Sequence, residues 1–427
     1  MTPPTAARSD VPAVDRLLDT AAGLFWEKGF AATTTREIAA ALEIQQASLY
    51  YHMASKEDLL CQIFESSLRP FLADVPAAVR AAAPRARIQV LIRVHVSMLL
   101  KYQKRNMTML TELRSLSPRH RHKVLAQRKQ YGDFVRSVLA EAQADGQIRG
   151  DIPAAYLSLA LLGMLNWAAR WFREDRDPQP DQLGELFFKL FLNGAASEGT
   201  ARGALHLPEL NSAQRSSKPC STKPLPSRAR RPAKAAENST MERLLEVAVA
   251  LFSHKGYVAT STREVAALLG MQKASLYYHI QSKEDLLYFI CKSSLEGIRR
   301  DVESAIDGVP DPLERTRVMI CAHMESMLRH QDEHATTLTE MFALSKDRLR
   351  SGAALREGYV DLVRSVLRDA QKAGVLRDDI DVRYLSLGVL GLMNRVLYWY
   401  RRGGFLSPGQ LGQLLAVIFL DGASRQA

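Results

Sequence analysis

Apolar residues recur at helical spacing almost throughout this chain of 427 residues. One such face predicts the first helix and is made of Val14, Leu17, Leu18, Ala21, Leu24 and Phe25. Gly29 predicts the end of that helix, and Thr34 or Thr35 can cap a second helix. The alternation of β-branched and polar residues that indicates strands is absent from the sequence. The pattern therefore predicts an all-α protein.

The next two predicted helices are short and adjacent. The third follows the second after a short break and runs over roughly Gln45 to Met53. Leu42, Ile44 and Leu49 are expected to hold the two helices at a fixed angle. Ser55 begins a fourth helix with an acidic first turn, which the helix dipole favours. Two short helices with a tight turn between them indicate a helix-turn-helix, because the second carries small polar and aromatic side chains.

The same series of residues occurs twice, so the chain contains two copies of one unit. Arg16–Leu68 aligns with Arg243–Leu295 without a gap, and well over half of the positions are identical. The match continues more loosely to the end of each half, for example between Val135–Leu139 and Val363–Leu367. A repeated unit of roughly 190 residues is too long for a solenoid and indicates a duplicated protein.

The repeat predicts five segments. The stretch between the copies is rich in Ser, Pro, Lys and Arg, as is typical of a flexible linker. Its residues 227–232 are basic and can enter a minor groove or lie along phosphates; the alternative is a solvated linker. We expect helix-turn-helix DNA-binding domains at 10–55 and 239–282, helical effector and dimerisation domains at 56–199 and 283–427, and the basic linker at 200–238.

Composition narrows the choice of partners. The net charge of +11 favours a polyanion, either nucleic acid or an anionic membrane surface. The longest apolar run, Tyr156–Ala169, is too short to span a bilayer, and the amino terminus does not resemble a signal peptide. We therefore expect a cytoplasmic protein without a membrane partner.

The chemistry of an enzyme is not indicated. The four cysteines form neither a CxxC pair nor a zinc-finger spacing, which favours reduced thiols. The sequence contains no nucleophile elbow, no glycine-rich phosphate loop and no paired Cys/His cluster. We expect no catalytic residues, no cofactor and no metal site.

The third predicted helix carries side chains suited to reading DNA. Gln can pair bidentately with adenine, and an alanine methyl group can meet a thymine methyl group. At the start of the second helix, hydroxyl groups, backbone N–H groups and an arginine can hold phosphate. The candidate DNA-binding residues are Thr34, Thr35, Arg36, Gln45, Gln46, Ala47, Ser48, Tyr50, Tyr51, His52 and Lys56, with Ser261, Thr262, Arg263, Gln272, Lys273, Ala274, Ser275, Tyr277, Tyr278, His279 and Lys283 in the second copy. The alternative is a plain helical bundle in which Tyr50, Tyr51 and His52 pack against the first helix.

These motifs closely resemble the DNA-binding domain of the tetracycline-repressor (TetR) family. The resemblance is carried by Ala-Ser-Leu-Tyr-Tyr-His followed by Ser-Lys-Glu-Asp-Leu-Leu, which occurs in both halves, and by the preceding Lys-Gly-Phe/Tyr and Thr-Arg-Glu stretches. It covers nearly all of each half outside the linker. It implies two tandem units, each with a three-helix DNA-binding domain and a helical ligand and dimerisation domain. By resemblance, residues 34–36, 45–52 and 56 would meet DNA, as would 261–263, 272–279 and 283.

Two features depart from the family's pattern. Family members usually work as homodimers of a single unit, whereas here both units lie in one chain. The position that ends the second helix is normally Gly; the second half has Gly270 there, but the first has Glu43. A residue other than Gly in a left-handed cap costs about 1 kcal/mol, so the first motif is expected to be strained or differently turned.

The resemblance also implies an effector pocket and a helical interface. The interface helices would be Ala154–Arg173 with Gln182–Asn193, and Arg383–Arg401 with Gln410–Leu420. The aromatic pattern near their ends resembles members that respond to acyl-CoA thioesters, although the aromatics can equally be core and interface anchors. For the paired histidines the alternative to a ligand role is a satisfied buried imidazole. The candidate pocket residues are His95, Glu112, Asn166, Trp167, Trp171, His323, Glu340, Asn394 and Trp399.

The sequence thus predicts a DNA-binding transcriptional regulator, of repressor type by resemblance, that a small hydrophobic or acyl-CoA effector releases. A linker of about 40 residues spans roughly 35 Å on average, so the halves can form an intramolecular pseudo-dimer on double-stranded operator DNA. We expect a near-palindromic operator, in which Gln46 favours adenine and Lys273 guanine. One rival arrangement is a homodimer of tandem chains. The rival function is a small-molecule-binding or protein-interaction module that no longer binds DNA specifically.

Overall fold

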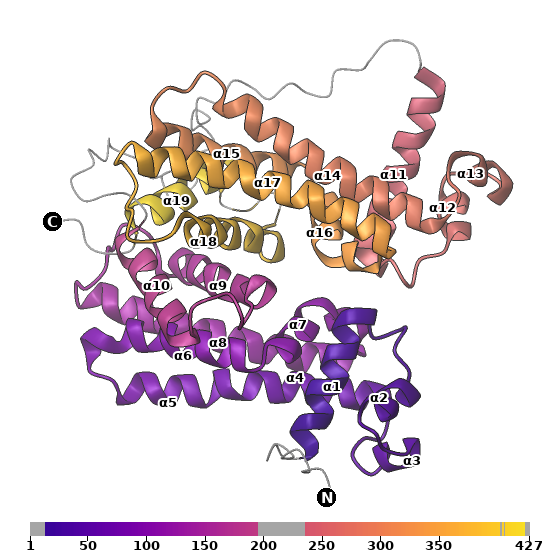
Figure 1. Cartoon of the computed structure of the whole chain (residues 1–427), viewed down its shortest axis with the longest axis horizontal. Coiled ribbons are helices and arrows are strands. Elements are labelled where there is room, and N and C mark those ends of the chain that lie inside the picture. Colours follow the sequence, from indigo (N-terminus) through magenta and orange to yellow (C-terminus); the bar gives the residue numbers. More distant parts are fainter. Residues whose placement is uncertain (1–12, 195–234, 402–403, 405, 423–427) are drawn as a thin grey trace, which may run out of the picture. The chain divides into compact units, whose positions relative to one another are not determined.

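The computed structural model describes residues 13–194, 235–401, 404 and 406–422, and every regular element in these ranges is a helix (Figure 1). This confirms the all-α prediction. The first repeat contains α1 (Ala13–Lys28), α2 (Thr35–Ala41), α3 (Gln46–Leu49), α4 (Lys56–Leu72), α5 (Asp74–Ala81), η1 (Pro84–Ala86), α6 (Arg87–Lys101), α7 (Gln103–Thr111), η2 (Leu113–Ser115), α8 (Pro118–Ala144), α9 (Ala154–Trp171) and α10 (Pro180–Asn193).

The second repeat follows a similar order, with one continuous helix, α14, where the first repeat has α4 and α5. It contains α11 (Ala235–Lys255), α12 (Thr262–Leu268), α13 (Lys273–His279), α14 (Lys283–Ile306), α15 (Pro312–Arg329), α16 (Gln331–Glu340), η3 (Met341–Ala343), α17 (Lys346–Lys372), α18 (Val382–Asn394), η4 (Arg395–Tyr398) and α19 (Pro408–Asp421). Helix α11 already begins at Ala235, inside the predicted linker. The rest of that linker, with its basic residues 227–232, lies outside the described residues.

The helix predicted over Gln45–Met53 is shorter than expected, because α3 ends at Leu49. The backbone N–H groups of Tyr50, Tyr51 and His52 bond to carbonyl groups three residues back, not four. This tighter turn brings the Met53 side chain into the core, where it is buried. The predicted helix Arg383–Arg401 is likewise shorter, because α18 gives way to the 3₁₀ helix η4 after Asn394.

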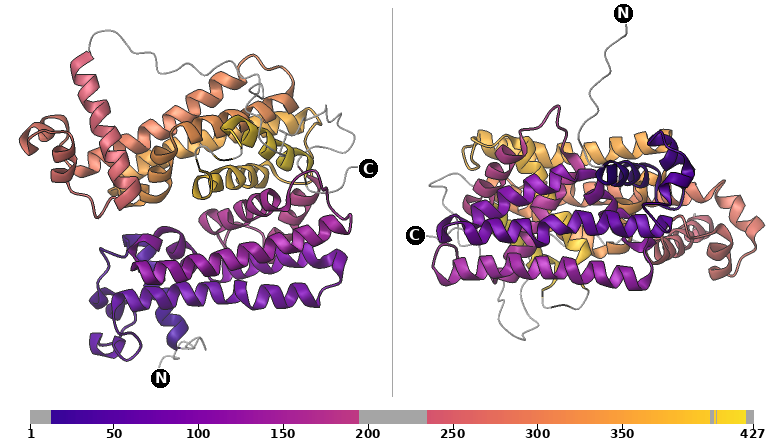
Figure 2. Two further views of the ribbon diagram at one scale, coloured as in Figure 1. Left: turned by 180° about the vertical axis from the view of Figure 1, so that it is seen from behind. Right: turned by 90° about the horizontal axis from the view of Figure 1, so that it is seen from below.

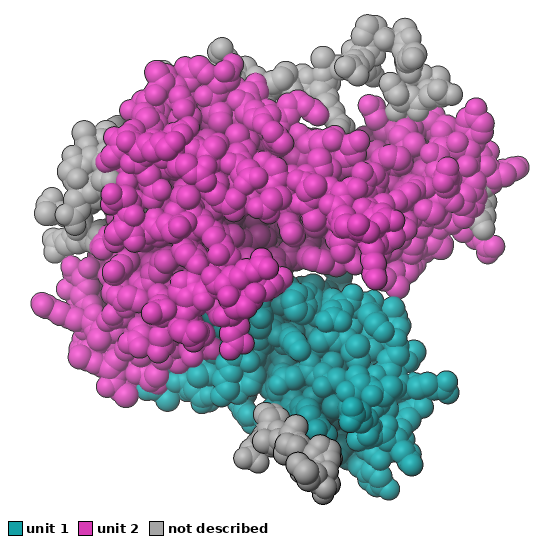
Figure 3. Space-filling model, in the orientation of Figure 1, with its two compact units in different colours: residues 1–77, 98–131 teal, residues 78–97, 132–427 magenta. Residues whose placement is uncertain are grey.

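The chain divides into two compact units (Figure 3). Unit 1 comprises residues 1–77 and 98–131, and unit 2 comprises residues 78–97 and 132–427. Unit 1 therefore holds the first three-helix head, α1 to α3, with the helices directly behind it. Unit 2 holds the remainder of the first repeat and the whole described part of the second repeat, including its head, α11 to α13.

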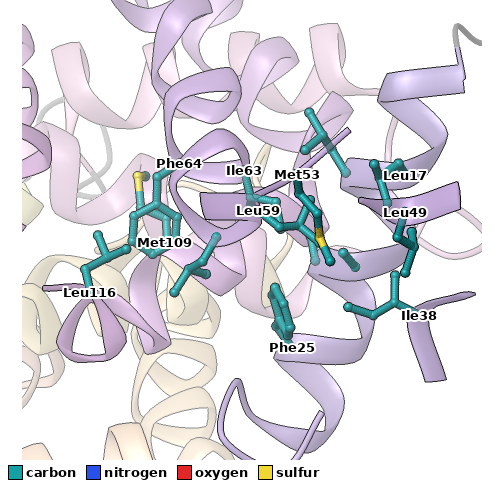
Figure 4. Close-up of a cluster of buried hydrophobic side chains, with 14 of the residues drawn as sticks. Leu17, Phe25, Ile38, Leu49, Met53, Leu59, Ile63, Phe64, Met109 and Leu116 are labelled. Carbon is teal, nitrogen blue, oxygen red and sulfur yellow. The ribbon is translucent and has the colours of Figure 1, made fainter. Parts of the chain in front are cut away.

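Each head is built on a small apolar core. In unit 1 the core joins α1, α2, α3 and α4 through Phe25, Ile38, Leu49 and Leu59, all fully buried (Figure 4). Leu42 is also buried, and Ile44 packs against the same cluster. The second head has the equivalent core, which includes Phe252, Val265, Leu276 and Leu286. Both cores fix the third helix of the head by a single buried leucine, Leu49 or Leu276.

Within unit 2, helices of the two repeats pack against each other: α9 against α18, and α10 against α19 (Figures 1 and 2). Close approach depends on glycine. A Cβ atom on Gly391 would lie 2.7 Å from Trp167 Cβ, and one on Gly163 would lie 3.0 Å from Arg395 Cβ. Both separations are shorter than normal contacts, so larger residues would force α9 and α18 apart.

The contacts between the repeats come in matched pairs. The Trp171 ring lies 6.0 Å from the Tyr384 ring, and the Tyr156 ring lies 6.5 Å from the Trp399 ring. Two ion pairs between the repeats break this match. Asp177 is buried, accepts a hydrogen bond from the Tyr384 hydroxyl, and pairs with Arg383 at 2.7 Å. Arg149 lies 3.9 Å from Asp421, whose equivalent in the first repeat is Asn193. The repeats thus meet with approximate twofold symmetry, which these ion pairs break.

Among the described helices, none combines the length and the apolar character that crossing a membrane demands.

Candidate nucleic-acid interface

The second helix of each head begins with a complete capping box. In the first head the Thr34 side chain accepts from the Glu37 N–H, while the Glu37 carboxylate accepts from the Thr34 N–H at 2.8 Å. Lys28 donates to the same carboxylate at 2.7 Å. The Lys28 hydrogen bond, followed by those from Thr34, lowers the pKa of Glu37 to about 2. Ser261, Glu264 and Lys255 form the same arrangement in the second head.

The tight turn has the same geometry in both heads. Glu43 has φ 58° and is the one described residue other than glycine with positive φ; Gly270 has φ 65°. In each head the turn closes with a backbone hydrogen bond of 3.0 Å, from Ile44 N–H to Ala39 O and from Met271 N–H to Ala266 O. The prediction of a strained cap at Glu43 is confirmed. The alternative, a differently shaped turn in the first head, is wrong because both turns have the same geometry.

The predicted tyrosines lie at the surface of each head, in the turn directly after α3 in the first and on α13 in the second. Tyr51 is 88% exposed and Tyr278 is 82% exposed. The neighbouring Tyr50 and Tyr277 are exposed as well. The alternative in which these tyrosines pack against the first helix is therefore wrong.

The other predicted contact residues lie around the same surface of each head. Exposed residues are Thr34, Arg36, Gln45, Gln46, Ala47, His52, Ser261, Arg263, Gln272, Ala274 and Ser275, and half-buried residues are Thr35, Ser48, Thr262 and His279. The side chain of Lys273 lies outside the description.

The two heads differ in how the threonine at the start of the second helix is engaged. In the first head, Gln46 Nε2 donates to Thr35 Oγ1 at 2.8 Å. In the second, Thr262 Oγ1 lies 3.3 Å from the Tyr277 hydroxyl oxygen. The threonine hydroxyl that could hold phosphate therefore contacts Gln46, a candidate for reading bases, in the first head. In the second head it contacts Tyr277.

Lys56 and Lys283 bind backbone carbonyl groups of their own heads. Lys56 Nζ donates to Phe30 O at 2.7 Å and Thr33 O at 2.9 Å, and lies 4.4 Å from the Phe30 ring centre. Lys283 makes the equivalent contacts to the loop after α11. Burial lowers the pKa of both ammonium groups, and nearby carboxylates oppose the shift. Sequence reasoning missed this structural role; a DNA contact from either lysine stays a prediction.

The predicted pocket histidines are buried among apolar helices. Burial lowers the pKa of His95 to about 3, opposed by a hydrogen bond with Asn166. Burial also lowers the pKa of His323 to about 3, and its Nδ1 lies 2.5 Å from the Tyr359 hydroxyl oxygen. Both imidazoles are therefore neutral near pH 7.

A third buried histidine, His334, was missed from the sequence. Its Nδ1 lies 2.7 Å from Ser294 Oγ, and burial lowers its pKa to about 3. In the first repeat, Ser67 Oγ lies 2.6 Å from Asn106 Oδ1 in the matching place. The alignment of the repeats would have drawn attention to this position, because a polar residue stands there in both repeats, Asn106 and His334.

Apart from Asn166, the other predicted pocket residues contact different parts of the described chain from those that His95 and His323 contact. Glu112 and Glu340 lie beside the loops after α1 and α11, where a Cβ on Gly29 or Gly256 would be 3.8 or 3.9 Å from their carboxylates. The tryptophans Trp167, Trp171 and Trp399 instead form the contacts described above, which join α9 to α18 and to the end of η4. Asn394 ends α18 and is half-buried. These positions agree with the interface-anchor interpretation of the aromatics.

Two protein families match the chain, each of them twice. The family described as "Bacterial regulatory proteins, tetR family" matches residues 17–63 and 244–288. The family described as "Tetracyclin repressor-like, C-terminal domain" matches residues 81–195 and 309–423. Together the matches cover more than half of the chain, once for each repeat.

Individual relatives align with one repeat at a time. The HTH-type transcriptional repressor KstR2 of Mycobacterium tuberculosis (strain H37Rv) is 29% identical over 44% of this chain and 95% of its own length. KstR2 of Rhodococcus jostii (strain RHA1) is 31% identical over 46% of this chain and 98% of its own length. A crystal structure of AibR in complex with isovaleryl coenzyme A and operator DNA is 28% identical, with a TM-score of 0.38, over 41% of this chain and 96% of that chain.

Proposed function

Because the chain belongs to the TetR family of bacterial regulatory proteins, we propose that it is a sequence-specific DNA-binding transcriptional repressor. The observation that carries the proposal is the exposure of Tyr51, in the turn directly after α3, and of Tyr278 on α13. Solvent-facing tyrosines beside polar residues, at a helix anchored by one buried leucine, are suited to a major groove and its flanking phosphates.

The residues of each head divide by the kind of DNA contact they suit. Arg36 and Arg263 are exposed in the first turn of α2 and α12, where a cation and the helix dipole favour phosphate. Gln45 and Gln272 are exposed at the start of the third helix, where an amide can reach a base edge. We assign Lys56 and Lys283 to holding the loop behind the second helix, since their ammonium groups already bind carbonyl oxygens.

The two repeats are proposed to act as one intramolecular pseudo-dimer. The packing of α9 on α18, with its matched aromatic pairs, supports this arrangement, because the equivalent family interface joins two subunits. The third helices of the two heads would then enter successive major grooves roughly 34–36 Å apart on a near-palindromic operator.

The effector is proposed to be a small hydrophobic molecule or an acyl-CoA thioester bound within the helices behind a head. Two buried polar atoms of the second repeat support such a site. His323 Nε2 and Thr336 Oγ1 have no hydrogen-bond partner among the described residues. A ligand with a polar group near an apolar chain would satisfy these atoms, because unpaired buried polar groups are costly.

Binding-site selection from random DNA followed by gel shifts tests the DNA proposal. Tyr51→Ala and Tyr278→Ala are each expected to lower operator affinity about tenfold or more, as loss of a backbone contact does. Tyr398→Ala is the matched control, since this exposed tyrosine lies on η4. Affinity should also fall steeply with salt, because binding releases counterions. Unchanged affinity in both head variants would refute the proposal and favour a module that does not bind DNA.

Native mass spectrometry tests the pseudo-dimer. One chain of 47.6 kDa per operator is expected. A chain pair, with four heads, would contradict the proposal. Gly391→Leu should separate α9 from α18 and lower operator affinity, whereas Gly150→Leu is a control because its Cβ would meet no atom within 4 Å.

Thermal unfolding with saturated acyl-CoA thioesters tests the effector class. A binding thioester present at 100 times its Kd should stabilise the protein by about 2.7 kcal/mol and release operator DNA. Free coenzyme A and free fatty acids are the controls. If no thioester shifts the melting temperature or the gel mobility, the acyl-CoA part of the proposal fails while DNA binding stands.

A further inference from the structure

Three potential metal ligands of the first repeat lie together in unit 1. Glu57 and Cys61 are one turn apart on α4, and His120 is in the first turn of α8. One ligand atom from each residue lies within 4.8 Å of the other two. Glu57 and His120 are half-buried, so a cation from solvent can reach the cluster through them.

The local hydrogen bonds aim these side chains at one another. Glu57 Oε1 accepts from the Ser117 N–H at 2.9 Å and lies 2.9 Å from His120 Nδ1. Ser117 Oγ lies 3.1 Å from the same nitrogen. These hydrogen bonds hold the Glu57 carboxylate of α4 beside the His120 imidazole of α8, and a metal ion bound by both would displace the bond between them.

The charges around the Cys61 sulfur favour a cation. The carboxylates of Glu57, Glu65 and Asp58 all act on the thiol. Their negative charges attract a cation to the sulfur, where a bound metal ion would replace the thiol proton. Lys123 lies nearby but is paired with Glu65 at 2.5 Å.

The second repeat holds a permanent cation in the same place. The positions equivalent to Glu57, Cys61 and His120 are Glu284, Tyr288 and Arg348. The Arg348 guanidinium pairs with the carboxylates of Glu284 and Asp285, and lies 5.5 Å from the Tyr288 ring centre. In the first repeat, the His120 imidazole replaces that arginine and the Cys61 sulfur replaces that tyrosine. Both replacements introduce groups that can bind a metal.

We propose that Glu57, Cys61 and His120 bind a divalent zinc ion, in the first repeat alone. Thiolate, imidazole and carboxylate are the ligands that zinc prefers, and the fourth tetrahedral position is left to water. Ligand atoms around tetrahedral zinc are about 3.5 Å apart, so these atoms, which lie within 4.8 Å of one another, need to move by about 1 Å to bind it. On binding, the S–H proton leaves to solvent and the sulfur bonds to the metal as thiolate.

The bound ion would join α4 to α8 behind the first head. Helix α4 begins directly after that head, and its first turn carries Glu57. Zinc would therefore stabilise unit 1 independently of any operator or effector. The proposal rests on the ligand geometry alone and stands whether or not the chain binds DNA.

Metal titration of the chelator-treated full chain tests the proposal. Calorimetry with Zn²⁺ is expected to give one equivalent, and Co²⁺ is expected to give the charge-transfer absorption of a cobalt–thiolate bond. Cys61→Ser and His120→Arg should each weaken Zn²⁺ binding at least tenfold, because each removes a ligand. Cys291→Ser is the matched control, since that cysteine is buried in the second repeat. His120→Arg should fold normally, because the second repeat accommodates arginine at this position.

A second variant tests the ligand set from the opposite direction. Tyr288→Cys with Arg348→His beside Glu284 should create a second site, so that the chain takes up two equivalents. The proposal is overturned if the wild-type chain binds no Zn²⁺ in stoichiometric amount, or binds it equally well after both Cys61→Ser and His120→Arg. A folded double variant without a second equivalent would also count against it.

Discussion

The two heads of this chain form the same turn from different residues. Glu43 and Gly270 adopt nearly the same φ, 58° and 65°, and the closing hydrogen bonds have equal lengths. The third helices nevertheless differ, because α3 has 4 residues and α13 has 7. The comparison teaches that one buried leucine, Leu49 or Leu276, fixes the placement of each third helix, while the length and the polar contacts of that helix are free to diverge.

The helices behind the heads show the same mixture of constancy and change. Ser67 and Ser294 occupy equivalent places, but the first contacts Asn106 and the second contacts His334. The contact between α4 and α8 in the first repeat recurs between α14 and α17 in the second. Glu57 accepts a hydrogen bond from the Ser117 N–H, and Glu284 accepts one from the Ser345 N–H. A homodimer cannot vary its halves separately, whereas a tandem chain can.

The largest expected effect concerns His334. Burial lowers its pKa to about 3, against about 6.5 in an unfolded chain. The folded state keeps the imidazole neutral, so its stabilising contribution is complete above pH 6.5 and is lost as the pH falls toward 3. At pH 5 this loss is about 2 kcal/mol.

His334→Asn gives the second repeat the residue of the first. It should reduce the fall in free energy of unfolding between pH 7 and pH 5 by about 2 kcal/mol. Urea unfolding at the two pH values measures this difference. An equal fall in both proteins would show that the two repeats do not differ in acid sensitivity at this position.

A smaller effect is expected from exchanging the base-reading residues. Gln46→Lys and Lys273→Gln should each make the two half-sites of the selected operator more alike, with about a tenfold change in preference at one base pair. Selection of binding sites from random DNA measures this. Perfectly symmetric sites for the wild-type chain, unchanged in Lys273→Gln, would remove this difference between the heads.

The smallest effect concerns the turn itself. Glu43→Gly should stabilise the first head by about 1 kcal/mol, because glycine adopts positive φ without a steric cost. Gly270→Glu is the reciprocal variant and should destabilise the second head by a similar amount. Hydrogen exchange of the α2 and α12 amides would follow the two changes separately. A destabilising Glu43→Gly would mean that this glutamate makes a favourable interaction that outweighs the strain.

Sequence reasoning succeeded where short-range chemistry decides the structure. The apolar periodicity of α1, the caps at Thr34 and Ser55, and the left-handed Glu43 all depend on residues within one or two turns. The end of α3 at Leu49 did not follow from the sequence, because three-residue and four-residue hydrogen bonds use the same side chains.

Features that depend on distant segments were harder to predict. The tryptophans of the predicted pocket form contacts between the two repeats. The aromatic pattern in the sequence fitted an effector pocket and an interface anchor equally well. Cys61 and His120 are far apart in sequence and meet only through the packing of α4 and α8. The sequence comparison of the repeats relates these two positions to Tyr288 and Arg348, which also contact each other in the second repeat.

The pairing of Asp177 with Arg383 has a consequence for how copies of this protein recognise one another. Asp177 belongs to the first repeat and Arg383 to the second. The first repeat has Ala155 at the position equivalent to Arg383. Two first repeats brought together would bury this carboxylate without its arginine, which is costly. The pairing therefore favours contact between unlike repeats over contact between two first repeats.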